Sequence, residues 1–166
     1  MAITETSLSP EAVDEAANLP PAQDPKGLVG LVGTGDHKAL GRLWIGVSLI
    51  FGIASLVLSA VSALGQRGGA TFPPTESIQR VFALSRVGLV FLFLVPLFIG
   101  LATYIVPLQV GSATVAFPRG AAAAFWTWLI AAGMFIGATI ANGGPGGTSK
   151  SMVDLSLLSL GLLLLA

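Results

Sequence analysis

The feature that most constrains this chain is an uncharged run of 22 residues from Val87 to Leu108. In a helix, about 20 apolar residues rising about 1.5 Å each cross the hydrocarbon core of a bilayer. A second uncharged run of the same length, Leu43 to Leu64, precedes it. Only 10% of the 166 residues are charged and 54% are hydrophobic, whereas soluble domains average about 25% charged residues. The sequence therefore predicts an all-α membrane protein.

The expected architecture is a polytopic helical bundle with three full transmembrane helices and the start of a fourth. The predicted helices cover about 38–64, 79–108, 121–141 and 152–166. Only 12 residues follow Asp154 in the last segment, too few to span a bilayer. We expect this helix either to enter the membrane without crossing it or to continue in a longer chain, and we favour the second.

Proline and small residues predict local features of these helices. Pro96 lies inside the second helix, where a proline usually leaves a kink. Gly46 and Gly52, together with serines, put small residues on the surface of the first helix, which lets a neighbouring helix approach closely. Gly133 and Gly137 form a Gly-x-x-x-Gly step, so the third helix is expected to pack tightly on another one.

Residues 1–35 are predicted to form an acidic, flexible N-terminal tail, with a docking arm for a partner subunit as the alternative. The first 25 residues contain five acids and no Lys or Arg, unlike a signal or transit peptide. The glycines at 30, 33 and 35 lack the Gly-Lys-Ser/Thr that a phosphate loop requires. Asp36 is instead suited to be the N-cap of the first helix.

Composition excludes several kinds of site. The chain has no cysteine, which removes thiolate metal sites and catalytic thiols. His37 is its one histidine, so no multi-histidine metal or haem site can form from this chain alone. The net charge is zero, and no basic patch suggests a nucleic-acid partner. The basic residues divide equally between the two membrane sides, so orientation stays open.

Several motifs follow one another from residue 36 to the end of the chain. They are DHK at 36–38 with Leu40-Gly41, FLFLVPLFIGLATYIVPLQVGSATVAFPR at 91–119, Phe125-Trp126, NGGPG at 142–146 and Val153-Asp154-Leu155. In this order and spacing they resemble the first quarter of subunit I of the haem-copper oxidases, the catalytic subunit of cytochrome c oxidase. The resemblance covers nearly all of residues 36–166. It implies a multi-pass protein of the bacterial plasma (inner) membrane and a respiratory complex with other integral membrane subunits.

The same resemblance shows that the family's functional residues are missing here. The first axial histidine of the low-spin haem lies eleven residues before the helix proline, a position that Ser85 occupies in this chain. The arginine at the haem edge corresponds to Ala63, and the acidic residue of a proton channel to Thr114. Two family asparagines correspond to Ala121 and Ala122. We therefore predict that the chain has no catalytic, cofactor-binding or metal-binding residues.

Two charged residues lie close to the ends of apolar segments. Arg86 follows Ser85 in the second helix, and Asp154 opens the fourth segment on the same side of the membrane. Charged groups at membrane depth are costly unless they are paired. The hypothesis is an intramembrane polar pair of Arg86 and Asp154, or contact of Arg86 with an interfacial phosphate. The alternatives are snorkelling of Arg86 and capping by Asp154.

The predicted function is a non-catalytic, cofactor-free accessory subunit with a structural or assembly role. Its partners would be other integral membrane subunits of a respiratory oxidase or related redox complex, together with lipids. The alternative is one part of a split haem-copper oxidase whose other helices supply haem and copper. A transporter or channel would need polar groups along its path, and the helices after Arg86 have almost none.

Overall fold

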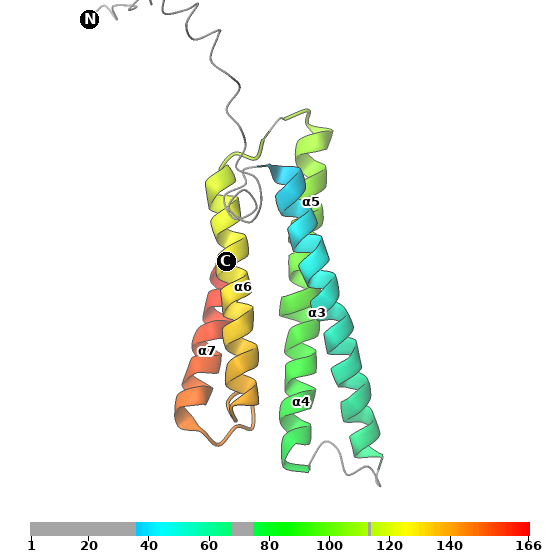
Figure 1. Cartoon of the computed structure of the whole chain (residues 1–166), viewed down its shortest axis with the longest axis vertical. Coiled ribbons are helices and arrows are strands. Elements are labelled where there is room, and N and C mark those ends of the chain that lie inside the picture. Colours follow the sequence, from blue (N-terminus) through cyan, green and yellow to red (C-terminus); the bar gives the residue numbers. More distant parts are fainter. Residues whose placement is uncertain (1–35, 68–74, 113) are drawn as a thin grey trace, which may run out of the picture. The chain divides into compact units, whose positions relative to one another are not determined.

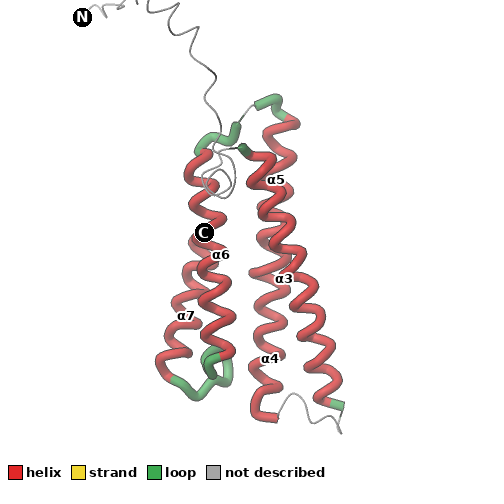
Figure 2. Tube along the Cα trace, in the orientation of Figure 1, coloured by secondary structure: helices red, strands yellow, loops and turns green. Residues whose placement is uncertain are grey.

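The computed structural model describes residues 36–67, 75–112 and 114–166. Within these ranges every regular element is a helix, as Figures 1 and 2 show. In chain order the elements are α3 (His37–Gln66), α4 (Thr75–Val87), the π-helical segment η1 (Gly88–Leu94), α5 (Val95–Gln109), α6 (Pro118–Ile140) and α7 (Lys150–Leu165). The expected tail and docking arm at 1–35 lie outside the described residues.

Three of the described helices are long and apolar enough to cross a membrane. They are His37–Gln66, Ser77–Gln109 and Pro118–Ile140, and the second comprises most of α4 together with η1 and α5. At about 1.5 Å per residue, the 33 residues of Ser77–Gln109 extend about 50 Å, beyond the roughly 30 Å hydrocarbon core. The prediction of an all-α membrane fold with three spanning helices is confirmed.

The helix ends follow local capping rules. Asp36 is the N-cap of α3, as predicted, and its carboxylate accepts a hydrogen bond of 2.9 Å from the Lys38 backbone N–H. Helix α6 begins at Pro118, three residues before the predicted start. Proline is favoured at the first helical position because its fixed φ suits the helix and the N–H it lacks would have no partner there.

Helix α3 packs along α4, η1 and α5 through small residues. A Cβ added at Gly100 would come within 2.7 Å of the Trp44 Cβ, and one at Gly41 within 2.8 Å of the Tyr104 Cβ. One added at Gly52 would come within 2.6 Å of the Phe93 ring. The prediction of close approach by small residues is therefore confirmed at Gly52. A Cβ added at Gly46, in contrast, would have nothing within 4 Å.

The aromatic core connects α3 with α6. Trp44 lies 5.1 Å from Phe125 and 4.9 Å from Trp128 between ring centroids, and all three side chains are buried. Phe51 meets Trp128 edge to face at 5.8 Å. Such aromatic pairs contribute about 0.5–1.5 kcal/mol beyond their burial in water-soluble proteins. This cluster fixes α6 against the α3 side of the bundle.

The second spanning helix widens just before its proline. The Val95 N–H donates to the Val90 carbonyl, five residues back, which is the π-helical register. In that register the Phe91 carbonyl would next accept from residue 96, but Pro96 has no N–H. Instead, the Trp128 indole Nε1 donates to the Phe91 carbonyl at 3.1 Å. An indole on α6 thus replaces the donor that the proline removes.

Helices α6 and α7 form a hairpin through the Gly-rich loop that follows Ile140. Asn142 has a φ of 66°, and its side-chain amide and the Thr148 hydroxyl are hydrogen-bond partners. The predicted tight packing of Gly133 and Gly137 does not occur among the described residues, since a Cβ added at either would meet none of their atoms within 4 Å. This face of α6 is left uncovered by the described helices.

Candidate functional site

Ser85 lies near the C-terminal end of α4 and is only 1% exposed. Its Oγ donates a hydrogen bond of 2.8 Å to the Phe82 carbonyl, three residues back in the same helix. Serine hydroxyls in helices commonly donate a hydrogen bond to a backbone carbonyl of the preceding turn in this way. The one hydrogen that the hydroxyl carries is therefore used inside its own helix.

Helix α3 lies directly against this part of the second spanning helix. Gly88 is three residues after Ser85 and therefore on the same helix face. A Cβ at Gly88 would come within 2.5 Å of the Ser55 Oγ on α3. Ser55 and Ser62 are both buried, and the Ser62 hydroxyl donates to the Ser59 carbonyl at 2.9 Å. Ser85 thus lies on a close helix–helix seam.

The residues present at this position do not fit an axial ligand of haem iron. Haem iron is held by imidazole, thiolate, thioether or phenolate groups, and a serine hydroxyl is not among them. His37 lies at the start of α3, 18 residues before Ser55, or about 27 Å along the helix. It therefore cannot replace the missing ligand beside Ser85.

His37 itself is enclosed at the beginning of α3. Its side chain is nearly fully buried, and within the described part of the chain neither ring nitrogen has a hydrogen-bond partner. Its Nδ1 lies 3.8 Å from an oxygen of Asp36, which is beyond hydrogen-bond distance.

The other positions singled out by the family resemblance also have side chains without redox or proton chemistry. Ala63 is exposed on α3, and Thr114 is exposed in the turn before α6, where its backbone carbonyl accepts a 2.6 Å bond from the Ser112 hydroxyl. Ala121 and Ala122 lie in the first two turns of α6 and pack toward the core.

Arg86 and Asp154 are both exposed, and in the described ranges no ion pair joins them. The Arg86 guanidinium carbon lies 5.0 Å above the centroid of the Phe82 ring, one turn earlier in α4. The structure therefore does not bring the two predicted charged residues together, and their pairing stays a prediction.

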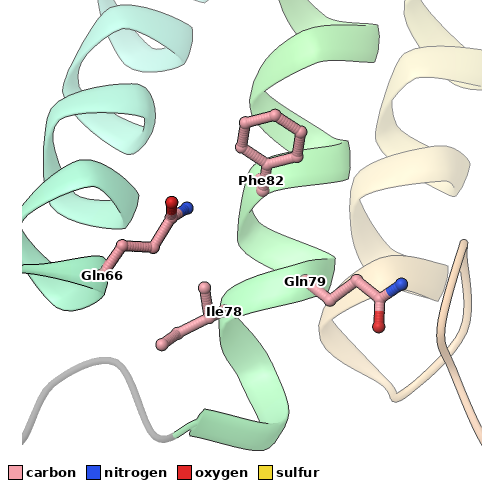
Figure 3. Close-up of a pocket in the computed structure, with 4 residues that line it drawn as sticks. All are labelled: Gln66, Ile78, Gln79 and Phe82. Carbon is pink, nitrogen blue, oxygen red and sulfur yellow. The ribbon is translucent and has the colours of Figure 1, made fainter.

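Two adjoining hollows lie where the end of α3 meets α4. The first, which we name the Arg86 groove, has a volume of about 210 Å³ and is lined by Ser59, Ser62, Ala63, Gln66, Phe82 and Arg86. The second, of about 390 Å³, is lined by Gln66, Ile78, Gln79 and Phe82. In Figure 3, the Gln66 side chain extends from α3 toward α4, whereas the Gln79 side chain, on α4, points away from α3. Sequence reasoning identified Arg86 but missed this groove, because Ser59, Ser62 and Gln66 carry no recognisable motif.

A third hollow, of about 330 Å³, lies between α4 and α6 and is mostly apolar. Arg80 lines it, and its Nη2 donates to the Ser77 hydroxyl at 3.2 Å. Within the described residues the buried Nε of Arg80 has no hydrogen-bond partner. No motif in the sequence indicates this cavity.

Comparison with known proteins matches this chain to a protein family. Residues 39–166 match the family model described as cytochrome c and quinol oxidase polypeptide I. The probable cytochrome c oxidase subunit 1-alpha of Streptomyces coelicolor is 35% identical over 115 residues, which cover 67% of this chain and 18% of that protein. The putative subunit 1-beta of Streptomyces avermitilis is 33% identical over 122 residues, covering 71% of this chain and 21% of that protein. The chain thus spans about a fifth of the length of these relatives.

Proposed function

Because this chain belongs to the cytochrome c and quinol oxidase polypeptide I family, we propose that it is a non-catalytic, cofactor-free membrane subunit of a respiratory oxidase or related redox complex. Its role there is structural or in assembly. The observation that carries the proposal is Ser85, which the family resemblance aligns with the iron-binding histidine and whose hydroxyl donates to the Phe82 carbonyl.

The packing around Ser85 supports this proposal. An axial imidazole needs free space between its helix and the porphyrin. Here Gly88 already approaches Ser55 of α3, and the Ser85 side chain is covered. The helices in this region pack directly against each other, without a cofactor between them.

The uncovered surface favours protein and lipid partners in a multi-pass membrane setting. Large apolar side chains on α3, such as Ile50, Ile53 and Leu56, are more than half exposed. Such surface is compatible with lipid or with other integral membrane subunits, and α6 adds the open Gly133–Gly137 face. We place the protein in the bacterial plasma (inner) membrane, as part of a multi-subunit complex.

Purification in mild detergent tests this function. The chain is isolated with an affinity tag, its absorbance is recorded in oxidised and reduced forms, and copurifying proteins are identified by mass spectrometry. The expected result is recovery of oxidase or related redox subunits, with no haem once those subunits are dissociated. Haem that remains on the dissociated chain would refute the proposal.

The alternative function is one part of a split, active haem-copper oxidase. The observation that favours it is length, because the matched relatives are about five times longer than the aligned segment. It predicts that the haem absorbance of the purified complex is lost when this chain is removed. Under the accessory-subunit proposal, removing the chain leaves the haem spectrum of the remaining subunits unchanged.

A further inference from the structure

The Arg86 groove has the depth of lipid headgroups. Arg86 is the last charged residue before the uncharged run Val87–Leu108, so it lies at the boundary of the hydrocarbon core. On α3 the groove ends at Gln66, the last residue of that helix. The groove therefore opens at the membrane surface rather than at the centre of the bilayer.

The charge in this groove lacks a counterion. Arg86 is exposed, and among the described residues it takes part in no ion pair. Its guanidinium carbon lies over the Phe82 ring at 5.0 Å, which orients the group through a cation–π contact. A guanidinium has five N–H donors along its edge, and a ring beneath its face does not occupy them. A cation in this position is stabilised by an anion that accepts two hydrogen bonds at once.

The other groove residues complement a polar headgroup with apolar chains attached. Gln66 brings a side-chain amide, and Ser59 is only partly covered. Phe82, which lines the groove, is 42% exposed, so apolar surface adjoins the charge. A free phosphate would contact only the charged group of Arg86. A phospholipid would contact both that charge and the adjoining apolar surface.

We propose that the Arg86 groove binds the phosphate of an anionic phospholipid at the membrane surface. The guanidinium of Arg86 donates to the phosphate oxygens, Gln66 hydrogen-bonds the headgroup, and the acyl chains follow the apolar surface of α3. Of the two contacts expected for Arg86 from the sequence, this selects the interfacial phosphate over Asp154. The proposal is independent of whether the chain carries a cofactor.

Native mass spectrometry of the delipidated 166-residue chain in detergent tests the proposal. The chain is titrated with phosphatidylglycerol, with phosphatidylcholine, and with phosphatidylglycerol in the presence of excess inorganic phosphate. We expect one tightly bound phosphatidylglycerol, weaker binding of phosphatidylcholine and little competition by inorganic phosphate. Arg86→Gln should weaken phosphatidylglycerol binding about fivefold, the effect of one cationic contact at a membrane surface, and Arg86→Lys should weaken it less.

Matched variants separate the groove from general charge. Arg67→Gln removes the same charge at the same end of α3 but outside the groove lining, and should leave binding within about twofold of wild type. Ala63→Leu narrows the groove without changing its charge, and should also weaken phosphatidylglycerol binding. Asp154→Asn should have no effect, whereas tighter binding in that variant would show that Asp154 holds Arg86. Equal affinity in wild type and Arg86→Gln, equal affinity for the two lipids, or full competition by inorganic phosphate would each overturn the proposal.

Discussion

Replacing Trp128 by Phe tests how this helix bundle accommodates a proline inside a spanning helix. The Phe91 carbonyl loses its π-register partner because Pro96 has no N–H, and the Trp128 indole donates to it at 3.1 Å. Leaving a buried carbonyl without a partner costs about 1–3 kcal/mol in soluble proteins. Interhelical hydrogen bonds in membranes average about 0.6 kcal/mol and reach about 1.7. The loss of this hydrogen bond in Trp128→Phe should therefore lower the free energy of unfolding by about 1 kcal/mol.

A double-mutant cycle isolates this part from the loss of ring area. Pro96→Ala restores a backbone N–H at residue 96, so the Phe91 carbonyl again has a donor within its own helix. We expect Trp128→Phe to cost about 1 kcal/mol less in the Pro96→Ala background than in wild type. The free energy of unfolding is measured by titrating detergent-solubilised protein with SDS and following helical circular dichroism.

A matched aromatic substitution controls the cycle. Trp44 packs in the same buried cluster, 4.9 Å from Trp128, but the indole that donates to the Phe91 carbonyl is that of Trp128. Trp44→Phe should therefore cost the same with Pro or Ala at position 96. If Trp128→Phe also costs the same in both backgrounds, the indole does not replace the missing N–H and the reasoning fails.

Four further predictions use the same unfolding assay. Gly88→Ala should destabilise the fold by about 1–3 kcal/mol, because its Cβ would lie 2.5 Å from the Ser55 Oγ, and Ser55→Gly should relieve most of that cost. Asp36→Ala should cost about 1 kcal/mol through loss of the N-cap, and Asp36→Asn much less. Ser85→His should cost about 1–3 kcal/mol by overpacking the seam with α3; unchanged stability would show free space there. Gly133→Leu should not destabilise the fold, because a Cβ there would meet no atom of the described residues within 4 Å and leucine favours a helix more than glycine does; a loss of stability would reveal a contact within the chain.

Much of the fold follows from the sequence, because hydrocarbon accepts few structures other than helices. The uncharged runs and the Asp36 cap locate the spanning helices to within a few residues. The start of α6 at Pro118 was missed, although proline at a first helical position is itself a signal. The π-helical segment was also missed. Pro96 predicts a disturbance, but its form depends on Trp128, a donor more than 30 residues away in the sequence.

The candidate site was less accessible from sequence because it depends on which helix faces meet. The motif order predicts Ser85 at the ligand position, but it does not reveal that Gly88, on the same helix face, approaches Ser55 of α3. Gly133 and Gly137 are expected to pack on a neighbouring helix, but among the residues that the structure describes they do not, because the same spacing is compatible with any partner helix. The groove beside Arg86 unites residues from two helices that no single stretch of sequence connects.

The retained fold has a physical basis in the seam between α3 and the second spanning helix. Gly41, Gly52, Gly88 and Gly100 let the two helices meet at van der Waals distance along this seam. In a membrane, where lipid is as apolar as the side chains, such close packing is itself a main source of helix association. A bundle held in this way would not need a porphyrin for its stability, which supports the proposal of a cofactor-free subunit. If Ser85 takes the place of a haem histidine, as proposed, then restoring a histidine at position 85 would have to overcome the close packing of Gly88 against Ser55 of α3.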